Sequence, residues 1–240
     1  MLSVCAALEG GRRQVFCVRV NRKRLPRGYM RLRQLATAAG VPVYEVNERE
    51  IAERAKGRSH AGVVAEVGER RAVELADLGN VPEPGMVAML DGIEDPYNFG
   101  SAIRSLYLAG ATGLVLGPRD WTSALTVVTR ASAGASELLP AAKVKTAAEA
   151  AEYFEALGWT ILLLEPKGEQ SLFQVDLTQP AFLIIGGEHR GAHRQLSDRE
   201  ITRVSIPYGR SSPISLGAAA TAAVVGFEVA RQRGVVHRPV

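Results

Sequence analysis

Short apolar runs bounded by glycine alternate with helix-like segments along the last two-thirds of the chain. Apolar runs of this length indicate strands buried on both faces, and such strands are typical of parallel sheets covered by helices. The alternation therefore predicts an α/β fold with a mostly parallel sheet and helices on both faces. Any ligand is expected beyond the carboxyl ends of the strands. The expected strands are residues 86–90, 113–117, 138–144, 159–164, 181–185 and 203–206, and the expected helices are residues 100–109, 123–133, 147–157 and 216–231.

The N-terminal residues predict a second, smaller α/β unit. Its expected strands are residues 15–20, 43–46 and 62–67, and its expected helices are residues 31–39 and 48–55. The stretch 68–85 is charged and then proline-rich, with Pro82 and Pro84, which is typical of a linker. The sequence thus predicts a small domain at residues 1–70, a linker at residues 71–85 and a large domain at residues 86–240.

Positive charge is concentrated near the N-terminus. The net charge is +4, but residues 1–75 hold 15 Lys and Arg against 8 Asp and Glu, whereas residues 76–240 hold 14 against 17. A basic segment attracts phosphate backbones, and guanidinium groups grip phosphates bidentately. The alternative is a solvated, positively charged face. The candidate RNA-binding residues are Arg12, Arg13, Arg22, Lys23, Arg24 and Arg31.

Several classes of protein lack support. No apolar run approaches the roughly 20 residues that span a bilayer, and the N-terminus lacks the pattern of a signal peptide. Cys5 and Cys17 form no CxxC pair, so neither a disulfide framework nor a structural zinc site is expected. The histidines show no metal-ligand spacing, and no GxSxG elbow supports hydrolase chemistry. We therefore expect a cytoplasmic protein with no membrane segment and no metal site.

The first segment that could carry chemistry follows the strand expected at residues 86–90. Asn98 can cap a helix that starts near Phe99, and Arg104 lies about one and a half turns inside that helix. Both side chains can then lie near the edge where the strands end. Alternatively, Asn98 is only a cap and Arg104 is an ion-pair partner of Asp91 or Asp95.

Two further segments also follow expected strands. Residues 186–191 form a glycine-rich turn with one carboxylate, Glu188, and glycines let a backbone approach a ligand closely. Residues 206–220 pass through a Gly/Ser/Pro loop into a small-residue helix that starts near Ser215. Ser215 is either the N-cap of that helix or a ligand contact. Each segment alone is a common pattern, and the set of three predicts one shared site.

The three segments together resemble the signature motifs of the SpoU/TrmH branch of the SPOUT RNA methyltransferases. The likeness covers roughly residues 86–233. The N-terminal residues, including 41–43 and 60–65, resemble the L30e-like substrate-binding domain often fused ahead of it. The matching motifs are Asp95-Pro96-x-Asn98-x-Gly100-x-x-x-Arg104, then Gly186-x-Glu188-x-x-Gly191, then Ile206-Pro207 followed by Ser215-Leu216.

The resemblance implies a large domain with a deep trefoil knot, dimerised through the knotted region. It implies S-adenosylmethionine as cofactor and methyl transfer to a ribose 2′-hydroxyl of rRNA or tRNA. The implied catalytic residues are Arg104, Asn98, Glu188 and Ser215, with Arg104 as a positioner and electrostatic stabiliser or as a base. The implied cofactor-binding residues are Gly186, Gly187, Glu188, Gly191, Ile206, Ser215 and Leu216.

One position departs from the family pattern. The third motif commonly reads Ser-Leu-Asn, and here Gly217 replaces the asparagine, so an amide that would face the site is missing. Two functions therefore stay open: an RNA 2′-O-methyltransferase, and a catalytically weak knotted RNA-binding module that still binds the cofactor. A Rossmann-type oxidoreductase is disfavoured because the GxGxxG fingerprint is missing. The sequence names neither the RNA nor the nucleotide, and base methylation also stays open.

Overall fold

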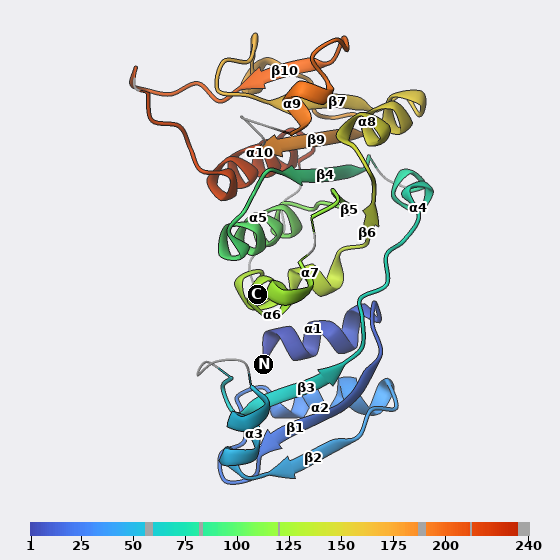
Figure 1. Cartoon of the computed structure of the whole chain (residues 1–240), viewed down its shortest axis with the longest axis vertical. Coiled ribbons are helices and arrows are strands. Elements are labelled where there is room, and N and C mark those ends of the chain that lie inside the picture. The colour runs from blue at the N-terminus through green and yellow to red at the C-terminus, as the bar shows by residue number, and fades with distance from the viewer. Residues whose placement is uncertain (56–59, 82–83, 120, 187–190, 212, 235–240) are drawn as a thin grey trace. The chain divides into compact units, whose positions relative to one another are not determined.

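The fold is described from a computed structural model that covers residues 1–55, 60–81, 84–119, 121–186, 191–211 and 213–234. The chain divides into two compact units (Figure 1). The first unit comprises Met1–Arg71 together with Ala133–Leu138, and the second comprises Ala72–Ser132 together with Leu139–Val240. A short piece of the predicted large domain, Ala133–Leu138, therefore belongs to the first unit.

The first unit is a three-stranded sheet covered by helices. The strand order is β2-β1-β3, with β1 parallel to β2 and antiparallel to β3. Val18 and Val20 of β1 pack against Leu32 of α2, whereas Arg19, which alternates with them, pairs with Glu50 of α3. Its elements are α1 (Leu2–Gly10), β1 (Val15–Asn21), α2 (Tyr29–Ala38), β2 (Val43–Val46), α3 (Glu48–Arg54), β3 (Val63–Val67) and α7 (Ala135–Leu138).

Helix α1 was not predicted from the sequence. Its segment has no polar stripe, because Cys5, Ala6, Ala7 and Leu8 are all buried. Cys5 and Leu8 join the core of the first unit, and α1 also contacts α7. A helix that is apolar all round lacks the 3.6-residue pattern that marks a surface helix. The missing pattern explains why sequence analysis did not find α1.

The second unit is built on a parallel sheet, as the sequence predicted. Its described residues form seven strands in the order β6-β5-β4-β9-β7-β10-β8, and every pairing among them is parallel. The predicted α/β class is confirmed. The strands are β4 (Met86–Asp91), β5 (Gly113–Leu116), β6 (Ala141–Lys143), β7 (Thr160–Leu164), β8 (Gln170–Ser171), β9 (Ala181–Gly186) and β10 (Thr202–Ser205).

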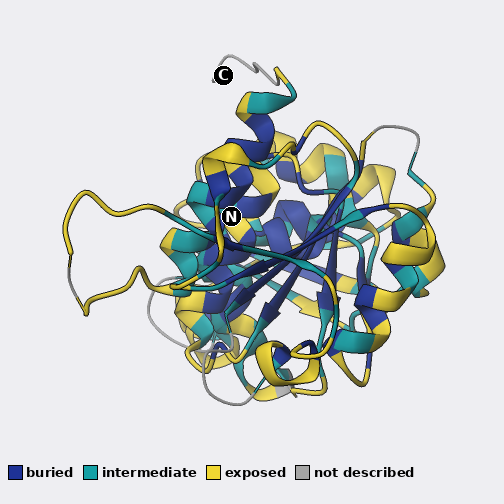
Figure 2. Ribbon diagram, turned by 90° about the horizontal axis from the view of Figure 1, so that it is seen from above, coloured by how far each residue is buried: buried dark blue, intermediate teal, exposed yellow. Residues whose placement is uncertain are grey.

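Helices cover both faces of this sheet (Figure 1). Helices α5 (Pro96–Leu108), α6 (Leu125–Ala131) and α10 (Ala218–Gln232) pack in a row on one face. On the other face, Met89 and Ile184 share a core with Phe154. Both faces of the central strands are therefore buried, which Figure 2 shows in dark blue. The helices on that second face are α4 (Leu75–Gly79), α8 (Ala147–Ala156) and α9 (Ala192–Gln195).

The predicted linker is wrong in one respect. Residues 72–81 belong to the second unit rather than lying free between domains. Val73 pairs with Ala142 as an isolated bridge, and Leu78 of α4 is buried in the core of the second unit. A single turn of amphipathic helix is too short to show a periodic pattern, and nearby prolines favoured a loop.

The longest described helix, α10, is rich in alanine and valine because it packs against α5. Gly226 of α10 lies so close to Ala109 that a Cβ there would contact it at 2.9 Å. Small residues thus allow the two helices to approach closely. Among the described residues, no helix is both long enough and apolar enough to cross a membrane.

Candidate active site

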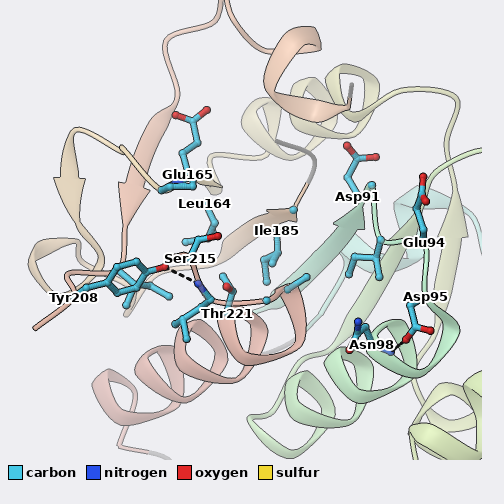
Figure 3. A pocket seen from close by; sticks show the side chains of 18 residues that line it. Asp91, Glu94, Asp95, Asn98, Leu164, Glu165, Ile185, Tyr208, Ser215 and Thr221 are labelled. Atoms are coloured by element: carbon cyan, nitrogen blue, oxygen red, sulfur yellow. Dashed lines mark hydrogen bonds between the residues drawn. The ribbon is translucent and has the colours of Figure 1, made fainter. Parts of the chain in front are cut away.

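A pocket lies where the strand order of the second unit reverses. From β4 the chain continues to β5 and β6 on one side, and later strands pair on the other side, with β9 next to β4. Parallel sheets bind ligands at such a switch point, beyond the carboxyl ends of the strands. A cavity of about 340 Å³ lies there (Figure 3), which falls in the usual range for small-molecule sites. It is lined from the ends of β4, β7, β9 and β10 and from the start of α10.

The first motif folds differently at its helix start than predicted. Helix α5 begins at Pro96, and Asp95 is the N-cap, whose carboxylate accepts a hydrogen bond from the Asn98 N–H at 2.7 Å. Proline at the first helical position suits its fixed φ and missing N–H. The prediction that Asn98 caps the helix was therefore wrong. Asn98 instead lines the pocket, and Figure 3 shows its side chain there.

The second motif is held against strand β4 by close backbone approach. Gly186 has φ +98°, and a Cβ there would overlap the carbonyl oxygen of Asp91, its partner in the sheet. At Gly191 a Cβ would overlap the Asp91 carboxylate, which accepts a hydrogen bond from the Ala192 N–H at 2.6 Å. Neither position has room for a side chain, so both must be glycine. Gly186 lines the pocket, and Gly191 is placed beside it through Asp91.

The third motif contributes one side of the pocket. Ile206, Ser215, Leu216 and Gly217 all line it. Helix α10 begins at Ala218 with Gly217 as N-cap, so Ser215 is not the cap and its hydroxyl is free of that role. The Leu216 N–H donates to the Tyr208 hydroxyl at 3.0 Å (Figure 3). No role was predicted for Tyr208 from the sequence.

Carboxylates dominate the charge of the pocket. Asp91, Glu94, Asp95 and Glu165 line it. Glu165 follows strand β7 and pairs with His193 of α9. No sequence pattern marked Asp91, Glu94 or Asp95 as a ligand contact, or marked Glu165 at all, although each lies at or just after the end of a strand. Negative charge and backbone carbonyls together suit a cationic sulfonium compound better than a nucleotide phosphate.

Arg104 lies outside this cavity. It is exposed on α5, and among the described residues it has neither an ion pair nor a hydrogen bond. The alternative of an ion pair with Asp91 or Asp95 is therefore not seen: Asp95 caps α5, and Asp91 accepts from Ala192. No described residue therefore occupies the guanidinium of Arg104, which lies on the same helix as Asn98.

Two predicted site residues, Gly187 and Glu188, lie outside the residues that the structure describes. Their assigned roles stay predictions. Within the described ranges, no group of three or more His, Cys, Asp or Glu side chains could hold a metal ion.

The basic segment of the first unit separates into distinct groups. Arg13 is buried, donates to both carboxylate oxygens of Glu137 at 2.8 and 3.0 Å, and donates to the Gly68 carbonyl. Its predicted role in RNA binding is therefore wrong, because Arg13 is buried and its guanidinium is already paired with Glu137, out of reach of a phosphate. Arg31 is exposed but pairs with Glu9.

The remaining basic candidates differ in their exposure. The side-chain Nε of Arg12 donates to the Leu138 carbonyl at 3.4 Å, and Arg12 is half-buried. Arg22, Lys23 and Arg24 are exposed on the loop between β1 and α2, and no ion pair holds them among the described residues. That loop is the part of the basic segment best placed to meet a phosphate.

Comparison with known proteins agrees with this geometry. The model of the SpoU rRNA Methylase family matches residues 85–227, and the model for RNA 2′-O ribose methyltransferase substrate binding matches residues 3–73. The 23S rRNA (guanosine-2′-O-)-methyltransferase RlmB of Pseudomonas putida is 34% identical over 208 residues, which are 84% of this chain and 82% of the relative.

Solved structures extend the comparison. The SpoU methyltransferase AviRb from Streptomyces viridochromogenes, crystallised with AdoMet, has a TM-score of 0.76 and 28% identity, over 98% of this chain and 89% of that chain. An rRNA methyltransferase from Sinorhizobium meliloti, at 24% identity, has a TM-score of 0.78 over 99% of this chain and 86% of that chain, which shows the shared fold.

The chain therefore belongs to the SpoU rRNA methylase family. The family resemblance predicted from three short motifs is confirmed, and so is the match of the N-terminal residues to a substrate-binding domain. Within that family it is an S-adenosylmethionine-dependent RNA 2′-O-methyltransferase.

Proposed function

We propose that this enzyme methylates the ribose of a guanosine in 23S rRNA, as the name of its relative from Pseudomonas putida states for that protein. The observation that carries the proposal is the pocket, which joins all three motifs at the switch point of a parallel sheet. A substrate-binding domain in the first unit supports a large RNA substrate. Such a substrate also supports the cytoplasm as its place of action.

The pocket residues fit the cofactor in charge and in chemistry. We assign its binding to backbone groups of Gly186, Ile206 and Leu216, with the glycine turn allowing close approach. S-adenosylmethionine supplies a sulfonium-bound methyl group, which is already a strong donor. The Leu216 N–H is held by Tyr208 in this structure, so a ligand that uses this N–H has to displace a half-exposed tyrosine.

The side chains of the site have little chemistry to perform beyond alignment. The Asn98 amide can hydrogen-bond and orient the acceptor ribose at the pocket edge. A guanidinium is a cation with several hydrogen-bond donors, so we assign Arg104 the stabilisation of negative charge on the acceptor oxygen. Ser215 can donate to the same region from the other wall. Glu188 keeps the predicted role of orienting the loop.

We also propose that the protein is a homodimer through α5 and α10. Leu108 of α5 is 62% exposed and Phe227 of α10 is 51% exposed, although the two helices pack on each other. Large apolar side chains exposed on neighbouring helices favour a partner surface. The trefoil knot stays a prediction, because the connections that would form it include residues 187–190 and 212, outside the described ranges. Light scattering of the purified chain tests the dimer, and a monomer would contradict it.

The function is tested with labelled cofactor and two RNA preparations. The purified chain is expected to bind S-adenosylmethionine in calorimetry and to transfer tritiated methyl to 23S rRNA from cells that lack the gene. Mapping of 2′-O-methyl groups should then show one guanosine whose modification depends on the enzyme. Transfer to tRNA alone would overturn the proposed substrate, and binding without transfer would favour the catalytically weak module.

Replacing Gly217 by asparagine is expected to help both the fold and the reaction. Gly217 has φ −65° and ψ 154°, which suits an N-cap, and a Cβ there meets no atom within 4 Å. An asparagine cap should raise the free energy of unfolding by a few tenths of a kcal/mol. The new amide also lies at the pocket lining, so kcat should rise severalfold. An unchanged kcat in single-turnover assays would show that Gly217 does not limit the reaction.

Neutralising the exposed basic loop is expected to weaken RNA binding. A triple change of Arg22, Lys23 and Arg24 to alanine should lower the slope of log affinity against log salt by about 2. Cofactor affinity should not change, since the loop belongs to the first unit. A matched control changes Arg49 and Arg54, which pair with Glu53 and Glu50 on α3. Equal salt slopes for the triple variant and this control would mean that the loop is a solvated face.

A further inference from the structure

A three-layer stack lies beside the first motif in the second unit. The Phe99 ring on α5 stacks on the Trp121 ring, with centroids 4.3 Å apart and planes 13° apart. On Trp121 lies the guanidinium of Arg119, with its Cζ 4.8 Å from the ring centroid. A cation over an indole face is attracted by the ring quadrupole, and tryptophan is the best of the aromatic residues for this contact.

The stack is tied to the pocket at two points. Arg119 Nη2 donates a hydrogen bond to the Glu94 carbonyl oxygen at 3.1 Å, and Glu94 lines the pocket. Phe99 directly follows Asn98, which also lines the pocket, and Phe99 is only 4% exposed. The inner end of the stack is therefore anchored in the core, whereas Arg119 at its outer end is exposed.

The guanidinium of Arg119 keeps most of its hydrogen-bonding capacity. Among the described residues it has no carboxylate partner, and a single carbonyl bond uses one of five donors. The stack and that bond fix its plane in advance, so little side-chain entropy is lost when it binds a ligand.

The acidic residues that line the pocket indicate which ligand the Arg119 guanidinium would bind. Glu94, whose backbone carbonyl accepts from Arg119, and Asp95 both line the pocket, and their carboxylates would repel an RNA backbone that approaches the cofactor. A fixed cation beside them compensates that repulsion locally. Guanidinium groups bind phosphate bidentately and are favoured wherever a phosphate must be oriented.

We propose that Arg119, held on the Trp121 ring, binds a backbone phosphate adjacent to the acceptor nucleotide and so positions the ribose at the pocket. Arg119 is a positioning residue, because it acts on the RNA rather than on the reacting atoms. The proposal rests on the RNA methyltransferase function. It adds a contact outside the three motifs, from the segment that follows strand β5.

The test compares Arg119→Ala and Arg119→Lys with a control, Arg199→Ala. Arg199 is a surface arginine that pairs with Glu152 and Glu155 of α8, and it does not line the pocket. For Arg119→Ala we expect the KM for RNA to rise about tenfold, with kcat for bound RNA changed less. The salt slope of RNA binding should fall by about 1.

The lysine variant separates the effect of the charge from the effect of the guanidinium geometry. Arg119→Lys should keep the salt slope but lose part of the affinity, because an ammonium lacks the planar fork. Calorimetry should give wild-type affinity for S-adenosylmethionine in both Arg119 variants. Wild-type KM and salt slope in Arg119→Ala would overturn the proposal. Failure of the wild-type protein to bind cofactor or RNA would instead overturn the function on which it rests.

Discussion

Replacing Gly186 by alanine is expected to weaken cofactor binding at least tenfold and to destabilise the second unit. The residue has φ +98°, and a Cβ would overlap the Asp91 carbonyl oxygen on the neighbouring strand. The backbone strain and the overlap together should cost about 2–4 kcal/mol. The melting temperature should fall by roughly 5–10 °C, because each kcal/mol shifts it by a few degrees. To make room for the alanine Cβ, strands β4 and β9 must move apart at the pocket. Calorimetry should therefore show at least a tenfold loss of cofactor affinity.

A second glycine provides the matched control for this change. Gly158 also has a positive φ, +77°, but a Cβ there meets no atom within 4 Å, and it does not line the pocket. Gly158→Ala should therefore cost only the backbone term, about 1–2 kcal/mol, and leave cofactor affinity unchanged. The difference between the two variants measures the overlap with Asp91. Equal stability and equal affinity in both would show that β4 and β9 tolerate the side chain.

Replacing Arg104 by alanine is expected to stop methyl transfer without harming the fold. Arg104 is exposed and makes no ion pair or hydrogen bond among the described residues. The free energy of unfolding should therefore change by less than about 0.5 kcal/mol. Loss of a donor that stabilises developing negative charge should lower kcat by about 100-fold or more. Cofactor affinity should stay near the wild-type value, because Arg104 does not line the pocket.

The lysine variant shows which property of Arg104 matters. Arg104→Lys keeps the charge but loses the fork of donors, so an intermediate kcat is expected if electrostatic stabilisation is the role. Single-turnover transfer of tritiated methyl at saturating RNA measures the step directly. Turnover at the wild-type rate in Arg104→Ala would remove the assigned role, and a large loss of cofactor affinity would mean that Arg104 belongs to the pocket instead.

The acidic pocket and the basic loop divide the charge of the chain between two ligands. Carboxylates from several strand ends suit a sulfonium cation, while exposed basic residues in the first unit suit RNA. The sequence already indicated this division, because residues 1–75 are basic and residues 76–240 are slightly acidic. The structure shows that Arg13 does not contribute to the exposed positive charge, because it is buried and its guanidinium is paired with Glu137.

The sequence by itself determined the α/β class, the order of most strands and helices along the chain, and the family. A strand that is buried on both faces is a short apolar run, whichever strands pair with it. The three motifs are also local patterns, so they can be recognised before the fold is known. Elements without a periodic pattern were not predicted, namely α1, α4, α7, β8 and α9, because they are short or apolar all round.

Only the tertiary structure decided which residues share the site. Strand order places the end of β9 beside the end of β4, so Gly186 meets Asp91 across about a hundred residues of sequence. Local geometry made Asp95 rather than Asn98 the helix cap, which leaves the Asn98 amide for the pocket. Packing against Trp121 fixed Arg119, which no motif marked. Contacts between distant segments depend on pairing and packing, and a linear pattern carries neither.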